Sequence, residues 1–195
     1  MRFCHQGVHR RVTLSSRLTG VGKSTFINAM AGKDTTTVGY DLTPCTTSIL
    51  PVVVLCRQDP SRRIVFVDTP GLDAMNEDYS VAFRRIVDWL VRSYGDRKKL
   101  AGVIYLHDIN QPRVSGPSRS HFGMLSELLG DGPSRTVVLT TTKWGDVEDN
   151  VGIQREKELS ATFWKDMAKL GSTITQFRDD SRSAWRIVDL ITERI

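Results

Sequence analysis

The chain has 195 residues, of which 39% are hydrophobic and 25% are charged. These values suit one soluble globular domain with its own core, and they exclude a disordered chain. The formal net charge of +5 permits an anionic partner, but it is too small to indicate a nucleic-acid-binding protein. No apolar run reaches the roughly 18 residues that would indicate a membrane span.

The three cysteines, Cys4, Cys45 and Cys56, are odd in number and have no C-x-x-C spacing. That pattern disfavours a disulfide framework or a zinc site and favours a reducing compartment. We therefore expect a cytoplasmic protein, with a mitochondrial presequence as the alternative because the first residues are basic. We expect residues 1–10 to form a basic tail and residues 11–195 to form one domain.

Short β-rich runs alternate with longer helical patterns along the chain. Because the strands are apolar throughout, we expect an α/β fold: a mainly parallel sheet covered by helices on both faces. Two runs on either side of the polar turn at 58–61 are expected to pair. The expected strands are 11–14, 49–56, 63–68, 100–106, 136–142 and 174–177. The expected helices are 24–31, 79–94, 118–129, one marked by Leu159, Phe163, Met167 and Leu170 that ends at Gly171, and one marked by Ala184, Val188, Ile191 and Ile195.

A glycine-rich segment, Thr-Gly-Val-Gly-Lys-Ser-Thr at 19–25, stands between the first strand and the first helix. Glycines allow successive backbone N–H groups to surround phosphate oxygens, and the start of the helix favours an anion. The full phosphate-loop pattern has another glycine six residues before its lysine, where this chain has Arg17. The residues expected to bind the triphosphate are Gly20, Val21, Gly22, Lys23, Ser24 and Thr25, with Lys23 also serving catalysis.

An acidic residue, Asp68, ends the strand at 63–68 and begins an Asp-Thr-Pro-Gly segment. An acid at such a strand end is suited to holding Mg²⁺ through its water shell, with a hydroxyl from the phosphate loop. We expect Ser24, Thr46 and Asp68 to hold Mg²⁺, with Thr47 as the alternative to Thr46. Backbone groups at Thr46 and Gly71 are expected to contact the γ-phosphate, so this region would respond to hydrolysis.

Taken together, these segments resemble a P-loop GTPase, and within that class the septin-like and immunity-associated branch. The blocks at 105–107 and 183–185, together with Arg113, are similar to single-G-domain proteins of fungi. The resemblance extends over about residues 12–195. It implies a three-layer P-loop NTPase sheet, GTP or GDP with Mg²⁺ as ligands, and self-association through the nucleotide face.

The guanine-reading segment of that family is matched by Thr142, Lys143, Trp144 and Asp146, but the acid comes one residue late. A carboxylate that selects a base has to be placed to within about half an ångström. Asp146 would reach the base if the loop bulges at Gly145, and the stem of Lys143 or the ring of Trp144 would pack on the purine. The loop at 178–180 is expected nearby.

Hydrolysis is expected to be slow because Leu72 occupies the position where related proteins have a water-orienting glutamine. Arg113 is a candidate arginine to act across a dimer. His107 is interpreted as a structural histidine, with a phosphate or dimer contact as the alternative. Trp89, Trp164 and Trp185 are interpreted as core or interface residues. Two alternatives to a slow GTPase switch remain: a degenerate scaffold that binds nucleotide but hardly hydrolyses it, and an ATP-using enzyme such as a small kinase.

Overall fold

The computed structural model describes residues 9–15, 20–32, 50–57, 59–61, 63–68, 88, 92, 101–111 and 137–193. Its strands form one six-stranded sheet in the order β2-β3-β1-β4-β5-β6. The strands are β1 His9–Ser15, β2 Leu50–Leu55, β3 Arg63–Asp68, β4 Gly102–Asp108, β5 Val137–Thr142 and β6 Thr173–Gln176. The helices are α1 Lys23–Ala31, the short 3-10 helix η3 Trp144–Asp146, α4 Asp149–Ala161, α5 Lys165–Lys169 and α6 Ser181–Thr192.

The sheet is parallel except at one edge, as the sequence predicted. β1 lies between β3 and β4, and both pairings are parallel, as are those of β4 with β5 and of β5 with β6. β2 pairs antiparallel with β3, which confirms the expected pairing of these two runs. β1 begins at His9, so the strand starts two residues before the expected domain boundary.

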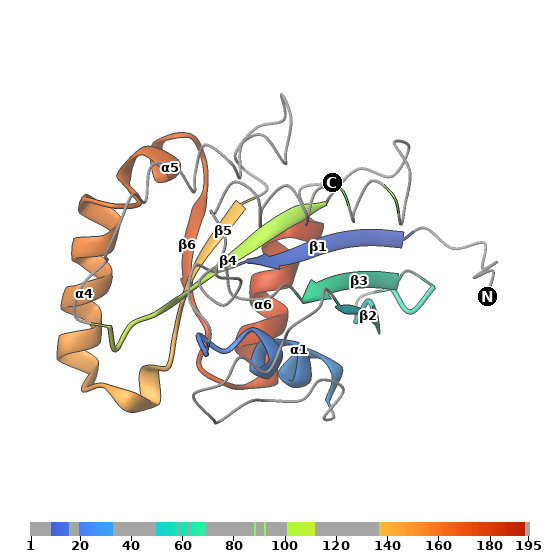
Figure 1. Ribbon diagram of the computed structural model, residues 1–195, viewed down its shortest axis with the longest axis horizontal. Coiled ribbons are helices and arrows are strands. Elements are labelled where there is room, and N and C mark those ends of the chain that lie inside the picture. Colours follow the sequence, from blue (N-terminus) through green and yellow to red (C-terminus); the bar gives the residue numbers. More distant parts are fainter. Residues whose placement is uncertain are drawn as a thin grey trace.

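Helices cover both faces of the sheet, so the α/β prediction is confirmed (Figure 1). On one face α1 and α6 pack on alternate residues of the strands, including Phe66, Ile104 and Val138. On the other face α4 and α5 pack on residues of the opposite parity, including Val137 and Leu139. The two-residue period of β5 therefore sends neighbouring apolar side chains into two separate cores.

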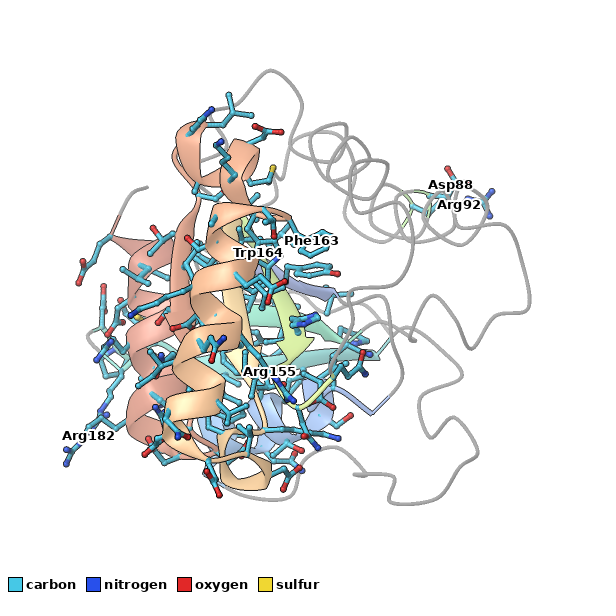
Figure 2. The ribbon with its side chains drawn as sticks, turned by 90° about the vertical axis from the view of Figure 1, so that its left-hand side faces the viewer. Asp88, Arg92, Arg155, Phe163, Trp164 and Arg182 are labelled. Carbon is cyan, nitrogen blue, oxygen red and sulfur yellow. The ribbon has the colours of Figure 1, made fainter. Side chains whose placement is uncertain are left out.

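The helix expected around Leu159–Leu170 is wrong in one respect, because the chain forms two helices, α4 and α5, with a turn between them. At this turn the Trp164 N–H donates to the Leu159 carbonyl over 2.8 Å, and the indole is buried in the core (Figure 2). Phe163 and Leu170 are 38% and 61% exposed. Burying the larger Trp164 instead of Phe163 ends the regular helical period.

The expected helices at 79–94 and 118–129 lie outside the described residues, apart from Asp88 and Arg92, which are both helical. Ile195 also lies outside them. None of the described helices is long and apolar enough to cross a membrane.

Gly152 in α4 packs against the ring of Trp144, and a side chain at this position would collide with it. An ideal Cβ at Gly152 would lie 2.6 Å from Cζ3 of Trp144. Glycine to alanine inside a helix normally stabilises by about 1 kcal/mol. Here we expect Gly152→Ala to lower the free energy of unfolding by about 1–3 kcal/mol, because the indole has to move. Chemical denaturation measures this change.

The control is Gly145→Ala, where a Cβ would meet nothing within 4 Å. We expect it to leave stability nearly unchanged. A Gly152→Ala protein as stable as the parent would show that Trp144 is not packed on α4.

His107 in β4 is a mostly buried histidine that lies edge-on to Trp164, with the ring centroids 5.9 Å apart. Burial lowers its pKa from 6.5 to about 4, and the neighbouring Asp108 opposes this only in part. Between pH 4 and pH 6.5, His107 is therefore protonated in the unfolded chain and neutral in the folded chain. Stability is fully present above pH 6.5 and is lost as the pH falls toward 4.

We expect this histidine to contribute a loss on the order of 3 kcal/mol between pH 7 and pH 4. The measurement is urea unfolding of the parent and of His107→Gln across this range. The difference in their free energies of unfolding should shrink or change sign as the pH falls. Parallel curves would mean that His107 titrates normally in the folded protein.

Candidate functional site

The segment before α1 has the backbone that a phosphate loop requires. Gly20 and Gly22 have φ angles of 78° and 95°, which residues with a side chain rarely adopt. An ideal Cβ on either glycine would meet no atom of the described residues within 4 Å. α1 begins at Lys23 without a side-chain cap. A glycine loop leading into an uncapped helix N-terminus fits the triphosphate tail of a nucleotide.

The side chains of this segment divide between core and site. Val21 is buried in the core under the sheet, so it offers only its backbone to a ligand. Lys23, the first residue of α1, is 6% exposed, and Ser24 and Thr25 after it are half-buried. A buried lysine beside glycine amides is a strong site for an anion, because its ammonium acts there with little screening by water.

One hydrogen bond joins the phosphate loop to the loop at the end of β5. The Thr142 hydroxyl donates to the Val21 carbonyl over 2.8 Å, and the His107 carbonyl of β4 lies 3.2 Å from the same oxygen. Thr142 is completely buried. The expected phosphate and base segments, 121 residues apart in sequence, therefore meet at one end of the sheet (Figure 1).

Lys143 follows with a φ of 59°, one of two positive values among the described residues that are not glycine. Its ammonium lies 3.3 Å from the carboxylate of Asp108 at the end of β4. Another oxygen of Asp108 accepts from the Asn110 N–H over 2.9 Å. This ion pair holds the strained turn against the end of β4 and leaves the lysine side chain about one-third exposed, at 37%.

The expectation that the Trp144 ring packs on a purine is wrong for this structure. The ring is 3% exposed, and its N–H donates to the Thr141 hydroxyl over 3.0 Å. The guanidinium of Arg178 lies 4.1 Å from the ring centroid, and Gly152 contacts the ring from α4. Trp144 therefore anchors the loop, and of the two side chains expected to pack on the purine face, the Lys143 stem is the one that remains.

Asp146 reaches the surface by a different route from the expected bulge at Gly145. Residues 144–146 form the 3-10 helix η3, in which the Asp146 N–H donates to the Lys143 carbonyl over 3.2 Å. Gly145 is exposed and does not take a positive φ. A single helical turn thus absorbs the extra residue and leaves Asp146 exposed at the edge of the site.

A polar network that the sequence did not reveal supports this loop from behind. The Glu156 carboxylate accepts from the Thr141 hydroxyl and from the Gln176 amide, over 2.8 and 2.6 Å. Gln176 in turn accepts from Arg178 over 2.9 Å, and Arg178 reaches Asp149 over the same distance. The network links β5, α4, β6 and the following loop, so it fixes how the two loops lie relative to each other.

Arg155 ties α4 to the loop after β4 by donating to the carbonyls of Ile109 and Asn110 over 3.0 and 2.9 Å. Figure 2 shows this side chain lying along the inner side of α4, whereas Arg182 of α6 points away from the protein. α4 is therefore hydrogen-bonded to the sheet at two places: Glu156 binds β5, and Arg155 binds the residues that follow β4.

The Mg²⁺ residues are only partly described. Asp68 ends β3 and pairs with Leu14 of β1, so its backbone lies at the sheet end from which the phosphate loop departs. Thr46, Thr47, Gly71 and the departures at Arg17 and Leu72 lie outside the described residues, as does Arg113. Among the described residues no three acidic, histidine or cysteine side chains gather around a metal position. The assignment of Mg²⁺ to Ser24, Thr46 and Asp68 stays a prediction.

Comparisons with known proteins agree with this geometry. A family model described as "50S ribosome-binding GTPase" matches residues 17–130, more than half of the chain. The chain belongs to this GTPase family. In a comparison with curated proteins, none matches.

Solved structures share the fold at low identity. Toc33 from Arabidopsis thaliana in complex with Mg²⁺ and GMPPNP has a TM-score of 0.70 and 16% identity, covering 95% of this chain and 85% of that one. A structure of the chloroplast translocon components atToc33 and psToc159, whose dimerization is described as important for their GTPase activity, gives 0.65 and 15%, covering 95% and 82%. Era from Aquifex aeolicus bound to GDP·AlF4⁻ gives 0.58 and 18%, covering 95% and 55%. These similarities establish the P-loop GTPase fold.

Comparing Thr142 with Thr140, both in β5, distinguishes the contribution of the Thr142 hydrogen bond to stability from the general effect of losing a buried hydroxyl. Thr140 is equally buried, but its hydroxyl has no hydrogen-bond partner in the described structure. We expect Thr142→Val to lower the free energy of unfolding by about 1–3 kcal/mol, because the Val21 carbonyl loses its donor.

The same substitution at Thr140 should be neutral or stabilising, since it removes a buried hydroxyl that makes no bond. Thermal unfolding gives the stabilities, and hydrogen exchange of the amides at 20–25 should rise only in Thr142→Val. Equal effects of the two substitutions would contradict the special role of Thr142.

Proposed function

We propose that this chain is a GTP-binding switch protein that hydrolyses GTP slowly with Mg²⁺ and is accelerated by self-association through its nucleotide face. The observation that carries the proposal is the Thr142–Val21 hydrogen bond, which joins the glycine loop to the base loop. Membership in the GTPase family supports it, as do the fold relatives bound to guanine nucleotides and Mg²⁺.

Each part of the site has a distinct task in phosphoryl transfer, which depends mainly on positioning and charge stabilisation. Lys23 and the amides of 20–25 hold the β- and γ-phosphates and neutralise their charge. Ser24, Thr46 and Asp68 would hold Mg²⁺, which would supply stabilisation of the negative charge that develops during phosphoryl transfer. Thr46 and Gly71 would contact the γ-phosphate and so report its presence.

Slow hydrolysis follows from Leu72, which cannot orient an attacking water. A second copy of the chain would then supply the charge-stabilising arginine across the dimer, and Arg113 is the candidate for it. For the fold relatives atToc33 and psToc159, dimerization is described as important for GTPase activity, which supports the same arrangement here. We also retain as proposals the septin-like, immunity-associated branch with its fungal resemblance, and a cytoplasmic location.

A degenerate scaffold is the second candidate function. It is favoured by Asp146, which stands one residue beyond the expected position, and by the sequence departures at Arg17 and Leu72. Such a protein would bind GTP through the same residues and barely turn it over.

Loss of the buried cation should weaken binding strongly. We expect Lys23→Ala to lower the affinity for fluorescent GTP with Mg²⁺ roughly 100-fold, because a charge-assisted contact to phosphate is lost. Lys165→Ala removes an exposed lysine of α5 and serves as the control, with unchanged affinity expected. Circular dichroism verifies that both variants fold. Binding by Lys23→Ala at parental affinity would overturn the proposed phosphate site.

Turnover separates the two candidate functions. We expect phosphate release per molecule to rise with protein concentration if self-association completes the site, and to stay near background for a scaffold. A constant, substantial rate at all concentrations would contradict the role of self-association while leaving a GTPase.

A further inference from the structure

Five side chains behind the loop at 143–146 form a closed set of contacts, the Glu156 network. The Trp144 indole N–H donates to the Thr141 hydroxyl over 3.0 Å, and that hydroxyl donates to the Glu156 carboxylate over 2.8 Å. The Gln176 amide donates to the other oxygen of Glu156 over 2.6 Å, and its carbonyl accepts from the Arg178 guanidinium over 2.9 Å. Arg178 closes the network by packing on Trp144, 4.1 Å from the ring centroid. One residue of α4 therefore joins the loop after β5 to the loop after β6.

The chemistry of the groups dictates the direction of every hydrogen bond in this network. Indole and guanidinium groups can only donate, so the Thr141 hydroxyl has to accept from Trp144 and the Gln176 carbonyl has to accept from Arg178. The single hydroxyl hydrogen of Thr141 and the NH₂ group of Gln176 are then both directed at Glu156. A carboxylate offers an acceptor oxygen to each of them, whereas a neutral amide of the same shape offers only one. The network therefore requires the charged form of residue 156.

Burial makes these hydrogen bonds hard to replace with water. Thr141 is completely buried, Trp144 is 3% exposed, and Glu156 and Gln176 are half-buried. A donor left without an acceptor in such surroundings costs more free energy than the same donor at the surface. We therefore expect the two loops to shift if the carboxylate is lost.

Thr141 links this network to the phosphate loop through the next residue of β5. Neighbouring residues of a strand point to opposite faces of the sheet. Thr141 accordingly binds Glu156 of α4, while Thr142 binds the Val21 carbonyl before α1. The end of β5, from which the loop at 143–146 departs, is thus held from both faces, by Glu156 on one and by the phosphate loop on the other.

We propose that Glu156 is a positioning residue of the nucleotide site, whose two acceptor oxygens hold the loops at 143–146 and 178–180 in one relative arrangement. It acts through Thr141 and Gln176 rather than by touching the ligand. This inference rests on the proposed function, in which the loop at 143–146 is one of the nucleotide-binding segments. A nucleotide held between this loop and the phosphate loop dissociates faster when the arrangement is lost.

Glu156→Gln tests the role of the charge while it keeps the shape of the side chain. The new amide has one acceptor for two donors, so either the Thr141 hydroxyl or the Gln176 amide faces an N–H group. We expect the affinity for GTP with Mg²⁺ to fall roughly 10-fold, mainly through faster dissociation. Displacement of a fluorescent GTP analogue in a stopped-flow instrument measures that rate. The indole N–H resonance of Trp144, assigned by its absence from Trp144→Phe, should shift as well.

Exchanging the two groups supplies a rescue that is specific to the directions of these hydrogen bonds. When Glu156→Gln is combined with Gln176→Glu, the new amide accepts from Thr141 and donates to the new carboxylate, which accepts from Arg178. Every hydrogen bond is remade at the same net charge, so we expect GTP affinity to return to within about twofold of the parent value. Gln176→Glu alone places two carboxylates face to face and should weaken GTP binding.

Glu158→Gln is the matched control, because it removes the same charge from an exposed residue of α4. We expect its GTP affinity and its Trp144 resonance to equal those of the parent. Urea unfolding of every variant verifies that the affinities are compared between folded proteins.

Two results would overturn the role of Glu156 while leaving the proposed function intact. Parental GTP affinity and dissociation rate in Glu156→Gln, even at a lowered stability, would show a structural role only. A double variant that binds GTP no better than Glu156→Gln would show that the hydrogen-bond directions do not position the site. A parent protein that binds no nucleoside triphosphate would instead refute the proposed function, and the inference with it.

Discussion

The hydrogen bond from the Thr142 hydroxyl to the Val21 carbonyl is the constraint on which the site depends. Thr142 ends one strand, Val21 precedes α1, and the bond between them spans 2.8 Å in a buried setting. Breaking this bond would leave a buried hydroxyl and a buried carbonyl without water to replace it, so the two loops are held together strongly. The distance between the glycine loop at 20–25 and the loop that follows β5 is thereby set by the protein itself.

The topology makes this junction available. In a parallel sheet the carboxyl ends of all strands lie at one edge, and β1, β4, β5 and β6 each deliver a loop there (Figure 1). The β1 and β4 pairing brings the phosphate loop next to the His107 carbonyl, which shares the Thr142 hydroxyl. Burial of neighbouring β5 side chains in separate cores on the two faces keeps the strand, and therefore Thr142, from rotating.

The base end is built on a different principle, in which strained loops are held by polar anchors. The Arg178 guanidinium packs on the Trp144 ring. Hydrogen bonds through Gln176 and Glu156 connect this pair to β6 and α4. Asp146 and Asp179, on the two loops that these groups support, are exposed. The polar network therefore fixes the positions of these two loops from the side of α4 and β6.

The order of strands and helices was predictable from the sequence because apolar periodicity and glycine turns are local signals. The phosphate loop was predictable for the same reason, since Gly20, Gly22 and Lys23 act through neighbouring backbone groups. The break at Trp164 was not, because the period of Leu159, Phe163 and Met167 is regular and only packing decides which aromatic ring is buried. The position of Trp144 beside Lys143 suggested a contact with the ligand. Its ring is instead buried in the core and is covered by Arg178. The loop at 178–180 was expected near the base segment, and the parallel pairing of β5 with β6, a contact between distant parts of the chain, is what brings the two loops together.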